Sequence, residues 1–89
     1  MLGMIIEKKA WPDLFQQVLE GKKKFDLRLA DFNCQSGDTL ILKEYNPETK
    51  QYTGRTLQKT ITFVLKTKDL EFWPQEETDK RGFIVMSLE

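Results

Sequence analysis

The chain has 89 residues, a formal net charge of zero, one cysteine and no histidine. This length predicts a single domain over residues 1–89, and the balanced charge excludes a strong overall attraction to polyanions, so nucleic-acid binding would need a local basic patch. The lack of histidine excludes Ser-His and Cys-His catalytic pairs and every zinc site that uses histidine, and a lone Cys34 excludes an internal disulfide.

Cys34 stands among polar residues, and a free thiol of this kind is typical of a reducing compartment. The sequence contains neither a signal-peptide core nor a long apolar run. We therefore expect a cytoplasmic protein with no membrane partner. The residue types present indicate no metal site and no cofactor.

A helix near the N-terminus is predicted by apolar residues that recur at i, i+3, i+4, i+7 and i+8 after a short apolar strand at residues 4–6. Pro12 suits the first helical turn, and Gly21 suits the position just after the end. The apolar residues in this spacing are Trp11, Leu14, Phe15, Val18 and Leu19.

The period then changes to two, which predicts a strand with one apolar and one charged face. We expect the apolar set to be buried and the charged set to line a concave surface. The apolar set is Phe25, Leu27 and Leu29, and the charged set is Lys24, Asp26 and Arg28. Trp11, Phe15 and Phe25 are expected in the core, and Trp11 is the best candidate among them if one stacks on a base.

Further strands are predicted at residues 39–45, 52–57, 59–66 and 83–88, with turn residues around 36–38 and 46–50. About five to six short strands with one main helix indicate an α+β fold that forms a small curled sheet or barrel.

The segment that follows the predicted helix has the spacing Gly21-x-Lys23-x-x-Asp26-x-Arg28, and a second turn, Gly37-Asp38, precedes a run of strand-forming residues. This pattern resembles the signature of the ASCH domain, a branch of the PUA-like superfamily, and the similarity extends over nearly the whole chain to compact bacterial and phage-type members described as RNA-binding. Those members usually carry glutamate at the position of Asp26. The resemblance implies a PUA-like β-pseudobarrel with a cleft beside the signature.

We therefore predict that the protein binds RNA, a nucleoside or a nucleotide through a basic cleft. In this interpretation Asp26 orients neighbouring cations, which hold a phosphate or a base edge. The alternative for Asp26 and Arg28 is an exposed ion pair worth about 0–1 kcal/mol. The predicted ligand-binding residues are Lys9, Trp11, Lys23, Asp26 and Arg28.

The resemblance also implies an alternative activity. Small bacterial ASCH proteins hydrolyse the acyl amide of N4-acetylcytidine with a lysine that matches Lys23, a threonine at the position of Asp26, and a distant glutamate. If this chain is such an amidohydrolase, Lys23 and Asp26 are its catalytic candidates, and the glutamate stays open among Glu71, Glu76 and Glu77. A third interpretation is a protein-interaction module without a small ligand. The sequence indicates no particular oligomeric state.

Overall fold

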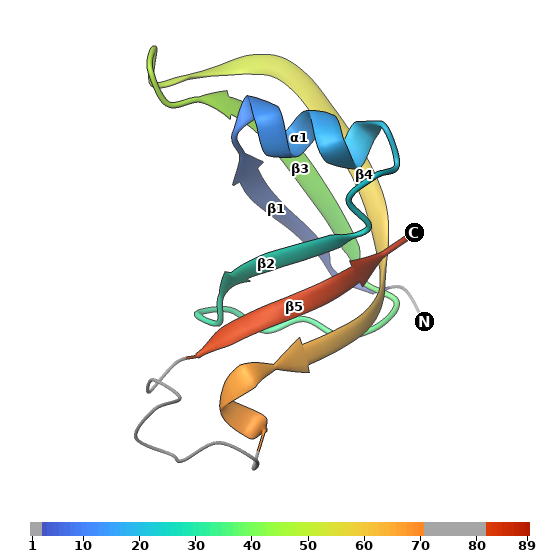
Figure 1. The fold of residues 1–89 in the computed structure, drawn as a ribbon. Helices are drawn as coiled ribbons and strands as arrows, with labels where there is room; N and C mark the ends of the chain where they lie inside the picture. The colour runs from blue at the N-terminus through green and yellow to red at the C-terminus, as the bar shows by residue number, and fades with distance from the viewer. Residues whose placement is uncertain (1–2, 71–81) are drawn as a thin grey trace.

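The computed structural model describes residues 3–70 and 82–89 (Figure 1). In chain order its elements are β1 (Ile5–Ala10), α1 (Pro12–Leu19), β2 (Phe25–Leu29), β3 (Thr39–Asn46), β4 (Gln51–Lys66), a 3-10 turn η1 (Thr67–Asp69) and β5 (Phe83–Leu88). No helix in the described ranges is long and apolar enough to cross a membrane.

The described strands form one five-stranded sheet in the order β1-β3-β4-β5-β2. The β1–β3 pair is parallel, and the other neighbouring pairs are antiparallel. The two strands predicted at residues 52–57 and 59–66 are a single strand, β4, of 16 residues. Because β4 pairs first with β3 and then with β5, it joins the two halves of the sheet, and Figure 1 shows it following a long arc.

The predicted α+β pseudobarrel is wrong, because the sheet does not close. Closure requires hydrogen bonding between the first and last strands of the sheet. Those outer strands are β1 and β2, and no ladder joins them within the described residues. A side chain crosses the gap instead, where Arg28 Nη2 donates a hydrogen bond of 2.7 Å to the carbonyl oxygen of Lys9. The fold is an open mixed sheet, mostly β, with one short helix.

Helix α1 packs Phe15 and Val18 into the core. Pro12 begins the helix, where its missing N–H removes no helical hydrogen bond, and Gly21 follows the end with a φ of 78°. Trp11 is 59% exposed, so the prediction that it is buried is wrong. Trp11 precedes the helix with extended backbone, so the helical periodicity does not determine where its side chain points.

The core lies between α1 and the inner face of the curved sheet (Figure 1). Its buried apolar residues are Ala10, Phe15, Val18, Leu40, Leu42, Ile61, Ile84, Met86 and Leu88.

Strand β2 alternates as predicted, but its two faces are reversed. Phe25, Leu27 and Leu29 are 48%, 55% and 42% exposed, whereas Asp26 is 5% exposed. An alternating pattern fixes the period of a strand without fixing which face meets the core. The inward position of Asp26 is stabilised by the neighbouring cations Lys23 and Arg28.

The outward side chains of β2 belong to a larger apolar surface. Residues directly opposite each other in a ladder share a face, so the register of β2 with β5 and of β5 with β4 places their apolar side chains on one side of the sheet. This outer apolar face consists of Phe25, Leu27, Leu29, Phe63, Leu65, Phe83 and Val85.

Candidate functional site

A pocket of about 570 Å³ lies where the gap between β1 and β2 meets the start of α1. Its lining residues come from the end of β1, the start of α1, the turn after α1, and β2. They are Lys9, Ala10, Trp11, Leu14, Lys23, Phe25, Asp26, Leu27 and Arg28. The structure therefore brings together in one pocket the residues that the sequence predicts as ligand-binding, although their role stays a prediction.

Asp26 provides the buried charge of this pocket. Arg28 donates a hydrogen bond from Nε to Asp26 Oδ2, and Lys23 Nζ lies 3.8 Å from Asp26 Oδ1. The side chains of Asp26, Lys23 and Arg28 are only 7%, 15% and 22% exposed. This is a partly buried cluster, not the exposed ion pair that was the alternative interpretation.

Arg28 is held from two sides. Its Nε is bonded to Asp26, and its Nη2 is bonded to the carbonyl oxygen of Lys9 across the gap between the outer strands. Nη1 makes no hydrogen bond within the described residues, so a fixed guanidinium offers donors to a ligand oxygen.

The turn after α1 selects one lysine of the lysine triplet for the pocket. Gly21 takes a positive φ, and the N–H of Lys23 donates to the carbonyl oxygen of Gln17 at 3.0 Å. Lys23 Nζ then donates a hydrogen bond of 2.7 Å to the carbonyl oxygen of Phe25 and lies 4.6 Å from the centre of the Phe25 ring. Lys22 instead pairs with Glu20 at 3.1 Å, and its side chain is 69% exposed.

Exposed apolar side chains form the wall of the pocket, and most of them were not predicted to bind a ligand. Trp11, Leu14, Phe25 and Leu27 are each between 48% and 59% exposed. Phe25 was predicted to be in the core, which is wrong. A signal was available, because Phe25 and Leu27 alternate with the signature residues and so flank any cleft that those residues form.

A second buried carboxylate, Glu44, was also missed. Arg55 donates from Nε and Nη2 to the two Glu44 oxygens at 2.9 Å each, and Thr53 Oγ1 donates at 2.6 Å. These hydrogen bonds, first from Arg55 and then from Thr53, lower the pKa of Glu44 to about 2. Arg55 Cζ also lies 4.9 Å from the centre of the Phe15 ring. The cluster links β3 and β4 to α1, and three hydrogen bonds from Arg55 and Thr53 already engage both oxygens of Glu44. The sequence did contain a signal for this position. Glu44 follows Leu40 and Leu42 at every second residue, so the three side chains share the inner face of β3.

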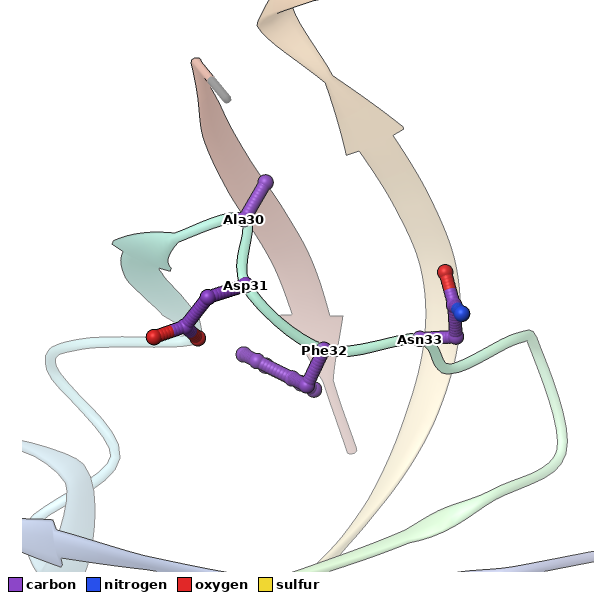
Figure 2. A pocket seen from close by; sticks show the side chains of 4 residues that line it. All are labelled: Ala30, Asp31, Phe32 and Asn33. Carbon is purple, nitrogen blue, oxygen red and sulfur yellow. The ribbon is translucent and has the colours of Figure 1, made fainter. Parts of the chain in front are cut away.

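Another hollow, of about 320 Å³, lies at the loop after β2 (Figure 2). Figure 2 shows that the side chains of Asp31 and Asn33 point away from each other. Asn33 Oδ1 already accepts a hydrogen bond of 3.0 Å from Lys66. Since its polar groups do not converge, this hollow is a weaker candidate than the pocket at β2.

The remaining chemical candidates add no site. Burial, and then the nearby Asp38 carboxylate, raise the pKa of the Cys34 thiol, which opposes formation of a reactive thiolate. The described residues contain no group of His, Cys, Asp and Glu side chains that could hold a metal ion. Glu71, Glu76 and Glu77 lie outside the described residues.

Comparison with known proteins places the chain in a family without assigning an activity. An uncharacterized 12.9 kDa protein in the GpA 3′ region of Escherichia phage P2 is 40% identical over 76 residues, which are 85% of this chain and 65% of the phage protein. The chain therefore spans less than two thirds of the length of this relative. A family profile described as a domain of unknown function (DUF3850) matches residues 5–88, which include every described strand and the helix. The chain belongs to the DUF3850 family.

Proposed function

We propose that this protein is an ASCH-like domain of the cytoplasm that binds RNA or a nucleotide in the pocket between β1 and β2. One observation carries the proposal: the pocket combines exposed aromatic rings with cations that the fold holds in place. Trp11 and Phe25 supply the rings, and Lys9, Lys23 and Arg28 supply the cations.

The chemistry of a nucleotide matches this combination. A base can stack on an aromatic ring, which contributes about 1–3 kcal/mol per base, and a phosphate can accept hydrogen bonds from lysine and arginine. The volume of about 570 Å³ lies within the range of small-ligand sites. Asp26 contributes indirectly, because its carboxylate fixes the guanidinium of Arg28, whose Nη1 makes no hydrogen bond to a described residue and can donate to the ligand.

The N4-acylcytidine amidohydrolase remains the alternative. Among the described residues that line the pocket, none carries a hydroxyl group, whereas the hydrolases use a threonine at the position of Asp26. Lys23 already contacts a carbonyl oxygen, a carboxylate and an aromatic ring. These contacts suit a lysine that binds a ligand as a cation.

A protein-interaction module is the third candidate, and the outer apolar face over β2, β5 and β4 favours it. This face carries no charged side chain in the paired register of the described strands. Exposed apolar surfaces of this kind often mark sites of protein association. The face and the pocket share Phe25 and Leu27, so the two functions do not exclude each other.

Titration of the pure protein with the four nucleoside 5′-monophosphates and with short single-stranded RNAs tests the proposal. We expect Lys23→Ala to weaken binding about tenfold or more, because a charge-assisted hydrogen bond is lost. Lys22→Ala is the matched control, since it removes a neighbouring lysine that points away from the pocket. If no probe binds, or if both variants lose affinity equally, the proposal is wrong.

The same preparation tests the alternative. The amidohydrolase predicts acetate release from N4-acetylcytidine that Lys23→Arg abolishes, because arginine keeps the charge and removes the amine. Our proposal predicts no acetate release by the wild-type protein and ligand binding that survives in Lys23→Arg.

A further inference from the structure

A smaller hollow of about 280 Å³ adjoins the pocket along β1. Its lining residues are Glu7, Lys8, Lys9, Lys43 and Tyr52. Lys9 lines both hollows, so a ligand in the first can reach the second without leaving the surface.

Tyr52 lines the second hollow, and its ring packs against a second tyrosine on the neighbouring strand. Tyr45 of β3 is directly opposite Tyr52 of β4, and their rings meet edge to face with centres 5.2 Å apart. Tyr52 is 50% exposed, so part of its side chain is open to a further aromatic group.

Cations surround these rings. Lys9 Nζ lies 4.3 Å from the centre of the Tyr45 ring, and Lys43 Nζ lies 5.0 Å from the centre of the Tyr52 ring. Glu7 Oε1 lies 3.4 Å from Lys43 Nζ and partly neutralises its charge. Lys9 is therefore the main cation between the two hollows. A surface contact between an ammonium group and a ring is weaker than a charge-assisted hydrogen bond, so a phosphate can draw Lys9 away from Tyr45.

We propose that the ligand is a single-stranded RNA of at least two nucleotides. One base occupies the pocket beside Trp11, the connecting phosphate contacts Lys9, and the next base stacks on Tyr52. This inference rests on the proposed function and narrows it, since a free nucleotide would use the first pocket alone. Alternating aromatic and cationic contacts along a surface are how proteins hold single strands without strong sequence preference.

The test compares ligands that fill one hollow with ligands that fill both. The probes are the four nucleoside 5′-monophosphates and the four homopolymeric RNA hexanucleotides, titrated against the full chain. We expect a hexanucleotide to bind more tightly than its monophosphate. Tyr52→Ala should weaken hexanucleotide binding about tenfold and leave monophosphate binding unchanged, because only the longer ligand reaches Tyr52. Trp11→Ala should weaken both.

Phe63→Ala is the matched control, because Phe63 is an aromatic residue of the same strand, is 60% exposed, and lines neither hollow. It should leave both affinities unchanged, and Tyr52→Phe should keep hexanucleotide binding because the ring remains. Equal affinity for the two ligand classes, or a Tyr52→Ala variant with wild-type hexanucleotide affinity, overturns the second subsite and leaves the first pocket intact. Absence of binding by every probe overturns the proposed function as well.

Discussion

Asp26 is a carboxylate at a core-facing position of an outer strand, and its neighbours explain why the fold tolerates it. Its side chain is 7% exposed and faces both Arg28 and Lys23. Removing one partner of a buried charge pair is costly because the remaining charge loses its counter-ion while staying away from water. We expect Asp26→Ala to lower the free energy of unfolding by about 3 kcal/mol. Urea unfolding followed by circular dichroism measures this change.

Asp31→Ala is the control, since Asp31 is exposed in the following loop and forms no ion pair among the described residues. It should change the free energy of unfolding by less than about 0.5 kcal/mol. Equal effects of the two substitutions would contradict the burial of Asp26. From sequence, the two-residue spacing predicted that Asp26 and Arg28 meet. It could not predict the hydrogen bond from Arg28 to the Lys9 carbonyl group, because Lys9 lies 19 positions away from Arg28 in the chain.

At the scale of elements, strands β3 and β4 are joined by a pH-sensitive ion pair between Glu44 and Arg55. The pKa of Glu44 falls from 4.5 to about 2 in the folded protein. Because the folded pKa is the lower one, the unfolded chain binds more protons in this range, so the stabilisation is present above pH 4.5 and is lost as the pH falls towards about 2. Unfolding midpoints in urea across this range should fall in the wild-type protein.

Glu44→Gln should weaken that pH dependence and lower stability at neutral pH, because the charge-assisted bonds to Arg55 are lost. Glu48→Gln, in the exposed turn between the same strands, should leave the curve unchanged. A Glu44→Gln variant that follows the wild-type pH profile would show that this carboxylate is not the group that titrates.

The location of the core gives a further test for the strands. Leu42 of β3 is completely buried, whereas Leu27 of β2 is 55% exposed. Leu42→Ala should cost about 3 kcal/mol of stability through lost burial and the cavity left behind, and Leu27→Ala should cost less than about 1 kcal/mol. Equal costs in urea unfolding would mean that the predicted orientation of β2, with its apolar residues inward, was correct.

The same two leucines show how far the sequence predicts the elements. Periodicity located α1 and the alternation of β2, because both patterns are local. The side of β2 that meets the core is decided by β5, which pairs with β2 from the far end of the chain. Either face of β2 could be buried, since its apolar residues can pack in a core and its charged residues can form a buried charge cluster. The alternating pattern alone therefore did not determine which face is buried.

At the scale of the whole molecule, the sequence predicted strands and a helix but not how the sheet is ordered. Pairing brings β1 beside β3 and β2 beside β5, and both partnerships bridge long stretches of chain. The absence of a β1–β2 ladder in the described residues is what leaves room for the pocket. The sequence predicted the ligand-binding residues beside a cleft, and the structure places these residues around one pocket. That pocket lies at the opening of the sheet and not in a closed barrel.

The balanced charge of the whole molecule predicts how binding depends on salt. With a net charge of zero, long-range attraction to RNA is weak, so only local cations release counter-ions on binding. Lys9, Lys23 and Arg28 are the cations of the pocket. If each contacts a phosphate, the logarithm of the association constant should fall with the logarithm of salt concentration at a slope of about −2, since each contact on a single strand contributes about 0.7.

Lys9→Gln should reduce the slope by about 0.7, while Lys22→Gln should not change it. A wild-type slope near zero would mean that phosphates are not bound, and a slope steeper than about −4 would require cations beyond those of the pocket.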